Sequence, residues 1–187
     1  MRKIAVVFPG VGYTKDRPLL YYAGKIAGSH GYELVHMDFS GIKWSKEQLK
    51  DKDFLLKTLD HCLERANTAL ANTDLSDSVS VLFISKSIGT VVATAYAKQY
   101  GINAKQICFT PLEFIDRFAE EKNGLIFYGS SDPYADPDVI AKICCEKHLT
   151  VYRIADADHS LETGDVIKDI SNLEFVMSKV KEFINIL

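Results

Sequence analysis

The chain has 187 residues, of which 47% are hydrophobic and 25% are charged, and its formal net charge is −3 at pH 7. A chain of this length fits one globular domain, so we treat residues 1–187 as a single domain. The small net charge disfavours nucleic acid and anionic membrane as partners. No apolar stretch approaches the roughly 20 residues of a membrane span, and the N-terminus lacks the pattern of a signal peptide.

Cysteines and potential metal ligands give no sign of a metal or a cofactor. The four cysteines show no C-x-x-C spacing, and two of them, Cys144 and Cys145, are adjacent. We therefore expect reduced thiols and a cytoplasmic protein. The sequence contains neither H-E-x-x-H nor a carboxylate cluster with the spacing of metal ligands. We predict that the protein needs neither a metal nor a cofactor.

Apolar runs and helical patterns alternate along the chain. Strands are predicted over residues 4–8, 32–39, 79–84, 106–109, 125–128 and 149–154. Helices are predicted over 18–29, 45–71, from the turn at 85–89 to Gly101, and over 113–121, 138–147 and 166–186. Such alternation predicts an α/β fold, a three-layer sandwich with a mostly parallel six-stranded sheet. Ligands of such sheets bind at the carboxyl ends of the strands.

The stretch 79–100 (VSVLFISKSIGTVVATAYAKQY) combines three signals. A run rich in β-branched residues predicts a buried strand, and small residues predict a closely packed helix after it. Between them lies S-x-S-x-G, formed by Ser85, Ser87 and Gly89. Strand, sharp turn and helix are the context of the G-x-S-x-G nucleophile elbow. Ser85 stands where that pattern has glycine, and a serine before a helix is also a common N-cap.

Three residues that suit acyl transfer follow three of the predicted strands. Ser87 follows the third strand, Asp132 the fifth and His159 the sixth. A serine hydroxyl needs a base to take its proton, and the base needs an acid to hold its tautomer. The chain order Ser, Asp, His is the order of the α/β-hydrolases. The three strand ends are neighbours if the sheet is wound 2-1-3-4-5-6.

The chain resembles the α/β-hydrolases, in particular their small esterase-like and dienelactone-hydrolase-like members. The matching segments are 8–12 (FPGVG), 85–89 (SKSIG), 129–133 (GSSDP) and 156–160 (DADHS). The resemblance covers essentially the whole chain. It implies a compact fold of strand order 2-1-3-4-5-6 without a cap, because residues 110–124 leave no room for one. It also implies an open site.

The resemblance further implies the role of each site residue. Ser87 is the nucleophile, His159 the general base and Asp132 the orienting acid. The backbone N–H groups of Ile88 and Val11 form the oxyanion hole. The family often has His-Gly in the first loop where this chain has Pro-Gly, which leaves open whether Val11 or Gly12 supplies the second donor.

Other residues compete for these roles. Asp136 and Glu113 are rival acids, and Asp132 precedes a proline, as many turn-forming aspartates do. Lys86 is discounted as the partner in a Ser-Lys dyad, because adjacent side chains on such a turn point apart. The remaining histidines, His30, His36, His61 and His148, have no partner pattern and are interpreted as structural.

The sequence predicts the reaction more sharply than the substrate. Gly12, Tyr13 and Tyr134 are predicted to bind a small-molecule acyl substrate. Further aromatic residues near the predicted cleft line it or simply pack loops; they are Tyr21, Tyr22, Trp44 and Phe114. The leading hypothesis is a serine hydrolase of the carboxylesterase or thioesterase type. The alternatives are a non-catalytic binding or scaffold protein on the same fold and a flavodoxin-like cofactor binder.

Overall fold

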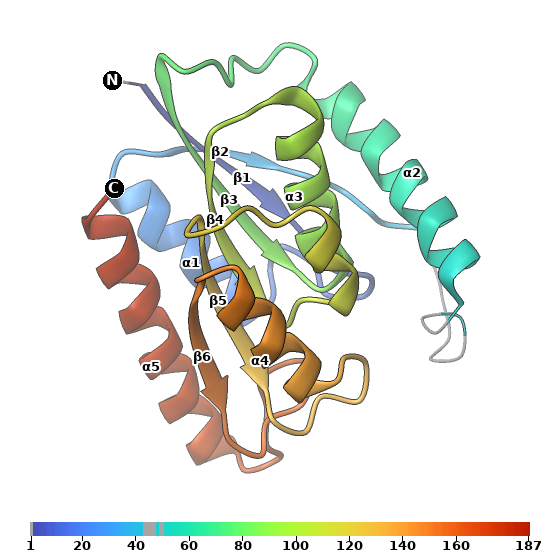
Figure 1. Ribbon diagram of the computed structural model, residues 1–187. Helices are drawn as coiled ribbons and strands as arrows, with labels where there is room; N and C mark the ends of the chain where they lie inside the picture. The colour runs from blue at the N-terminus through green and yellow to red at the C-terminus, as the bar shows by residue number, and fades with distance from the viewer. Residues whose placement is uncertain (1, 43–47, 49–50) are drawn as a thin grey trace.

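A computed structural model describes residues 2–42, 48 and 51–187 (Figure 1). One parallel sheet contains the strands β1 (Arg2–Phe8), β2 (Glu33–His36), β3 (Val79–Lys86), β4 (Ala104–Phe109), β5 (Gly124–Gly129) and β6 (Thr150–Ile154). Its order is β2-β1-β3-β4-β5-β6, and all neighbouring strands pair in parallel. The predicted fold class and strand order are confirmed.

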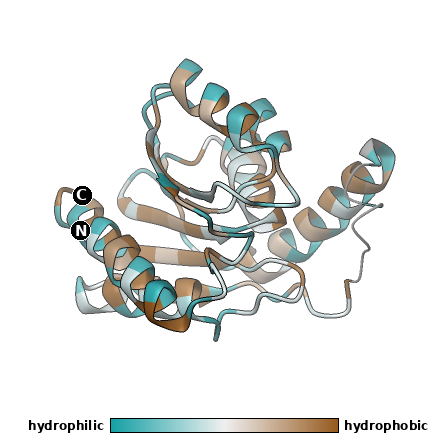
Figure 2. Ribbon diagram, turned by 90° about the horizontal axis from the view of Figure 1, so that it is seen from below, coloured by the Kyte–Doolittle hydropathy of each residue, from teal (hydrophilic) through white to brown (hydrophobic). Residues whose placement is uncertain are grey.

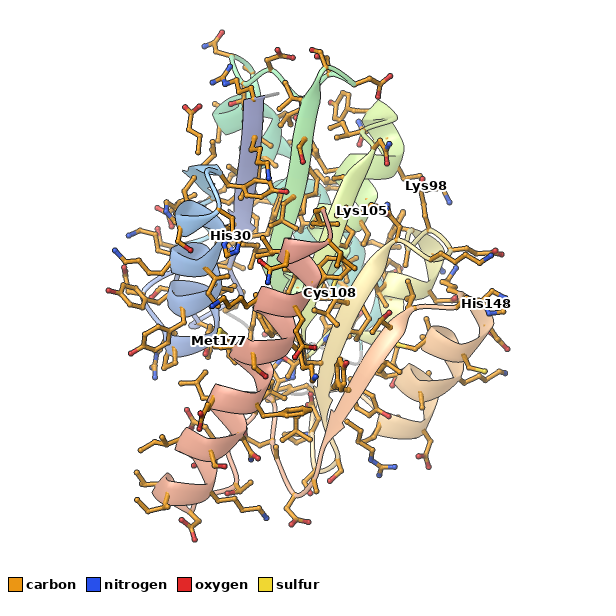
Figure 3. The ribbon with its side chains drawn as sticks, turned by 90° about the vertical axis from the view of Figure 1, so that its left-hand side faces the viewer. His30, Lys98, Lys105, Cys108, His148 and Met177 are labelled. Atoms are coloured by element: carbon orange, nitrogen blue, oxygen red, sulfur yellow. The ribbon has the colours of Figure 1, made fainter. Side chains whose placement is uncertain are left out.

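Helices cover both faces of the sheet. They are α1 (Pro18–Ser29), α2 (Lys52–Leu70), α3 (Ile88–Tyr100), α4 (Pro137–Glu146) and α5 (Val166–Asn185). Helices α1 and α5 lie on one face, and α2, α3 and α4 lie on the other (Figure 1). His30 joins α1 to α5, since its Nε2 lies 2.7 Å from Asn185 Oδ1 (Figure 3). This histidine is therefore structural, as predicted.

The alternating side chains of β1 show how the sheet is buried between the helices. Ile4 and Phe8 pack in the cluster with α2 and α3, whereas Ala5 and Val7 pack in the cluster with α1 and α5. All four side chains are fully buried. Figure 2 accordingly shows hydrophobic strands between the helical layers. A strand covered on both faces needs a continuous apolar run, which explains why this segment shows no polar alternation.

Two predicted elements are shorter in the structure. The strand predicted over 32–39 is β2, which ends at His36 because the chain then bends into a turn in which Asp38 Oδ1 accepts from the Ser40 N–H. The helix predicted over 113–121 is a 3-10 helix, η2 (Glu113–Arg117). A segment this short gains too few backbone hydrogen bonds to sustain an α-helix.

The start of α2 follows from its cap. The Asp51 Oδ1 accepts from the N–H groups of Asp53 and Phe54, which are otherwise unpaired at a helix start. The helix therefore begins at Lys52. The predicted helical part at 45–50 lies, apart from residue 48, outside the described residues. In the part of the chain that is described, no helix has the length and apolar character needed to cross a membrane.

Candidate active site

Ser87 occupies a strained turn between β3 and α3. Its backbone has φ 56° and ψ −126°, a conformation that side-chain-bearing residues rarely adopt. The Ser87 N–H donates to the Phe109 carbonyl at 3.0 Å. The Ser87 carbonyl accepts from the Thr90 N–H at 2.9 Å and from Thr90 Oγ1 at 2.6 Å. These hydrogen bonds hold the serine in place against the strain.

The residues two positions before and after Ser87 explain how the turn fits. A Cβ atom on Gly89 would collide with the carbonyl oxygens of Phe8 and Pro9, so only glycine fits there. Ser85 stands where the elbow pattern has glycine, yet it is fully buried without an unpaired hydroxyl. Its Oγ donates to the Ile107 carbonyl at 3.1 Å. The departure from the pattern is therefore compatible with the elbow geometry.

The three predicted side chains meet at the carboxyl ends of β3, β5 and β6, which point to the same edge of the sheet (Figure 1). His159 Nε2 lies 2.8 Å from Ser87 Oγ, and His159 Nδ1 lies 2.7 Å from Asp132 Oδ2. The other Asp132 oxygen accepts from the Tyr134 N–H at 2.8 Å. The Asp132 side chain is only 3% exposed. Acid, imidazole and hydroxyl thus form one continuous chain of hydrogen bonds.

A glycine at the end of β5 allows the histidine loop to reach the acid. A Cβ atom on Gly129 would collide with the carbonyl oxygens of Ala157 and Asp158. The same loop is tied down by the Ser131 N–H, which donates to the Ala157 carbonyl at 2.9 Å. This close approach carries His159 over the end of β5 and toward Asp132.

The environment of His159 favours its neutral form. Burial lowers the pKa of His159 below its ordinary value, and the nearby Lys86 ammonium lowers it further. The hydrogen bond that the His159 Nδ1–H donates to Asp132 opposes this shift but does not reverse it. At neutral pH the imidazole is therefore unprotonated at the nitrogen that faces Ser87 Oγ. That state is the one a general base requires.

Two backbone N–H groups lie beside the serine without a partner. Ile88 is the first residue of α3, where N–H groups have no partner inside the helix. Across the described ranges, no hydrogen bond involves the N–H of Ile88 or of Val11. Gly10 brings the first loop close, since a Cβ atom there would lie 3.1 Å from Ser87 Cβ. Gly12 follows in the same loop and, with φ 71°, turns the chain.

A cavity of about 300 Å³ opens beside Ser87 and His159. All three predicted substrate-binding residues, Gly12, Tyr13 and Tyr134, line it. The Tyr134 ring lies 4.8 Å from the His159 ring. Tyr134 also borders a larger groove of about 760 Å³, which Phe114 helps to line. The remaining predicted aromatic residues are elsewhere: Tyr21 and Tyr22 are 43% and 47% exposed on α1, and Trp44 lies outside the described residues.

The rival acids have other partners. Asp136 caps α4, because its Oδ1 accepts from the Asp138 N–H at 2.9 Å. Glu113 Oε1 accepts from the Asp136 N–H at 3.0 Å. Neither carboxylate is bonded to His159, so Asp132 is the acid that the fold presents to the imidazole.

Within residues 2–42, 48 and 51–187, no cluster of three or more His, Cys, Asp or Glu side chains is arranged to hold a metal ion.

Sequence reasoning discounted Lys86 as a partner of Ser87 and did not place it at the cavity. As expected, Lys86 makes no hydrogen bond with Ser87 among the described contacts, but its side chain lines the same cavity. The residue is 2% exposed, and its Nζ lies 4.9 Å from the centre of the Tyr13 ring. Its position next to Ser87 was the one available signal, and that position does not reveal the direction of the side chain.

Sequence comparisons identify no relative. A scan against protein-family models found no match, and a search of curated proteins found none either.

Residues 110–123, all of which are described, contain η2 and loop but no cap between β4 and β5.

Comparison of the structure with solved structures finds similar folds. XC6422 from Xanthomonas campestris, described as an α/β serine hydrolase without a lid, has a TM-score of 0.61 and 15% identity over 97% of this chain and 82% of its own. Est1E from Butyrivibrio proteoclasticus has a TM-score of 0.67 and 13% identity over 97% of this chain and 86% of its own. An α/β serine hydrolase homologue from Coxiella burnetii has a TM-score of 0.57 and 13% identity over 95% and 84% of the two chains. The chain therefore has the α/β-hydrolase fold in its compact form without a cap.

Proposed function

We propose that the protein is a serine hydrolase that cleaves a small ester or thioester through an acyl-enzyme on Ser87. The observation that carries this proposal is the hydrogen-bonded chain from Asp132 through His159 to Ser87, with separations of 2.7 and 2.8 Å. Such a chain is what a hydroxyl nucleophile requires. The fold supports the same interpretation, since XC6422 is described as a serine hydrolase and the Coxiella protein as a serine hydrolase homologue.

In the first half-reaction, Ser87 Oγ attacks the carbonyl carbon while His159 Nε2 takes its proton. Asp132 accepts from the Nδ1–H, which keeps the free electron pair of the imidazole on the nitrogen that faces the serine. The charge on the carbonyl oxygen is stabilised by the N–H groups of Val11 and Ile88. Each such donor typically contributes about 3 kcal/mol in the transition state. The imidazolium then protonates the leaving alcohol or thiol.

In the second half-reaction, water attacks the acyl-enzyme and His159 again takes the proton. The collapse of the second tetrahedral intermediate returns that proton to Ser87 Oγ and releases the acid. Tyr134 and Tyr13 border the cavity next to the serine and would contact the acyl or alcohol group. Est1E has been solved with ferulic acid bound, so a protein of this fold holds a small carboxylic acid in that case.

A fluorophosphonate probe tests the proposal directly. The probe should label the wild type at one site, and Ser87→Ala should abolish the labelling and lower kcat for 4-nitrophenyl acetate by about 10⁶-fold. Ser160→Ala is the matched control, because Ser160 lines the same cavity and should leave the labelling intact. Equal labelling of the Ser87→Ala protein would refute the assignment. A folded protein that hydrolyses no short ester or thioester would favour the binding-protein alternative.

A further inference from the structure

Lys86 is a buried lysine whose amino group has no polar partner among the described residues. The residue is 2% exposed, although lysine is among the residues least often buried without a partner. Within the described part of the chain, its ammonium group has no hydrogen bond and no ion pair. Its one close contact is the face of the Tyr13 ring, 4.9 Å from Nζ. A buried charge of this kind is costly unless something compensates it.

The packing around Lys86 holds its ammonium group at the wall of the cavity beside Ser87. The methylene stem lies against the first loop, where a Cβ atom on Gly10 would stand 3.2 Å from Lys86 Cδ. The Tyr13 ring is held in turn, since its hydroxyl accepts from the Leu19 N–H at 3.1 Å. Lys86, Ser87 and His159 all line the cavity of about 300 Å³. The buried lysine and the nucleophile therefore border the same space.

The two carboxylates near Lys86 are already committed to other partners. Asp132 binds His159 Nδ1 and the Tyr134 N–H. Asp158 Oδ1 accepts from two backbone N–H groups of its own loop, at 2.7 and 3.1 Å. Neither carboxylate forms an ion pair with Lys86. A second cation, the exposed Arg17, lies on the wall of the same cavity.

We propose that Lys86 binds a carboxylate group of the substrate, so that the hydrolase prefers short esters or thioesters that carry a negative charge. The inference rests on the proposed function for the reaction, but the binding of a carboxylate does not depend on it. A cavity of 300 Å³ holds about ten non-hydrogen atoms, given about 30 Å³ for each water-sized group. This size suits a monoester of a four- or five-carbon dicarboxylic acid.

The proposal also predicts a dependence on pH. Burial lowers the pKa of Lys86 to about 7, against the opposing effect of Asp132 and Asp158. Above this pH the free enzyme loses the ammonium charge, so the preference for a charged over a neutral ester should fall about tenfold per pH unit. Among the other groups at the cavity, burial raises the pKa of Tyr13 to about 12 and lowers that of His159. Arg17 and Asp158 complete the set of charged groups that border the cavity.

A pair of matched esters separates charge from shape. Mono-4-nitrophenyl succinate differs from 4-nitrophenyl butyrate by a carboxylate in place of the terminal methyl group. 4-Acetoxybenzoate and 4-methylphenyl acetate make the same comparison on the alcohol side. Lys86→Met should lower kcat/KM for the charged member of at least one pair by about 10- to 100-fold, as expected when a charge-assisted hydrogen bond is lost. The neutral member should stay within about threefold.

Several outcomes would overturn the proposal. An equal loss for charged and neutral esters would give Lys86 a structural role, and no loss for either would give it none. If the Lys86→Met protein does not fold, the wild type still decides the matter, because a constant ratio of charged to neutral kcat/KM from pH 6 to 9 excludes the proposal. This ratio cancels the titration of His159, which affects both esters alike.

Direct binding of succinate to the Ser87→Ala protein separates this proposal from the proposed reaction. Calorimetry at pH 6.5 should detect binding of succinate that Lys86→Met weakens at least tenfold, with butyramide as the neutral control. Binding of succinate in a protein that cleaves no ester would support the carboxylate site and contradict the hydrolase. If the wild type cleaves charged and neutral esters equally well and the Ser87→Ala protein does not bind succinate, the hydrolase is supported and the carboxylate site is contradicted.

Discussion

Both edges of the sheet contain residues other than glycine with a positive φ, but these residues differ in their surroundings. At the amino ends of β5 and β6, Lys122 and His148 have φ values of 56° and 51° in exposed turns, and Figure 3 shows His148 on the outside. At the carboxyl ends of β3 and β4, Ser87 and Thr110 have φ values of 56° and 43° but are buried. A residue other than glycine with a positive φ costs about 1–3 kcal/mol in backbone strain.

What differs is the burial of the strained residues. The N–H of Ser87 donates to the Phe109 carbonyl, and the N–H of Thr110 donates to the Phe127 carbonyl at 2.7 Å. The N–H of Lys122 likewise donates to the Lys147 carbonyl at 2.9 Å, but Lys122 is exposed. The strain at Ser87 and Thr110 is therefore enclosed by the packed core, whereas the strain at Lys122 is open to relief by substitution.

Among changes that keep the nucleophile, the largest expected effect is at the acid of the carboxyl edge. Asp132→Asn should lower kcat by about 10⁴-fold, because an amide no longer holds His159 in the tautomer that accepts the serine proton. Steady-state kinetics with 4-nitrophenyl acetate measures this loss. Asp136→Asn makes the same chemical change at a helix cap and should leave kcat within about threefold. Similar losses in both variants would remove Asp132 from the proposed role.

The next largest effect is on stability, and it should distinguish Gly89 from Gly28. Gly89→Ala should destabilise the fold by about 3 kcal/mol or more, because the new methyl group meets two backbone carbonyls that cannot move aside. Gly28→Ala, at an exposed position of α1 with ordinary clearance, should stabilise by about 0.5–1 kcal/mol. Urea unfolding of both variants measures the difference. A neutral Gly89→Ala change would contradict the tight strand–helix approach at the elbow.

The pH dependence sharpens the account of His159. Its pKa is lowered by burial, and the protonated ring accepts no proton from Ser87. Hydrolysis of a neutral ester should therefore lose activity only below pH 6.5, by about tenfold per unit. Because the Lys86 ammonium also lowers this pKa, Lys86→Met should move the acid limb to higher pH. An acid limb above pH 6.5 in the wild type would contradict the buried, neutral imidazole.

The smallest effect is expected at the amino edge. Lys122→Gly should stabilise the protein by about 1 kcal/mol, since glycine adopts the left-handed conformation without the steric cost. Thr110→Gly relieves the same strain but removes a buried side chain from the carboxyl edge, so it should give no net gain. Thermal unfolding of the two variants tests this contrast. Equal stabilisation would show that the two edges hold their strain alike.

Much of the fold follows from local patterns in the sequence. The helix predicted over 18–29 has those bounds in the structure, because Pro18 suits a first turn and Gly31 follows the end. The alternation of apolar runs and helices predicts a parallel sheet, and the strand order is the one expected. The positions of Ser87, Asp132 and His159 after predicted strands indicated that the three residues would lie at one edge of the sheet.

Other features depend on contacts between distant segments. The sequence alone left Asp136 and Glu113 as rival acids. In the structure, the loop after β5 is packed so that Asp136 caps α4 and Glu113 accepts from the Asp136 N–H. The sequence likewise offered no reason to place Lys86 in the cavity, since that position depends on how the first loop and Tyr13 enclose the side chain. Periodicity and turn residues act over a few positions, and so they determine elements and their order. The direction of a single side chain at a strand end depends on loops that come from elsewhere in the chain, and so the tertiary structure decided it.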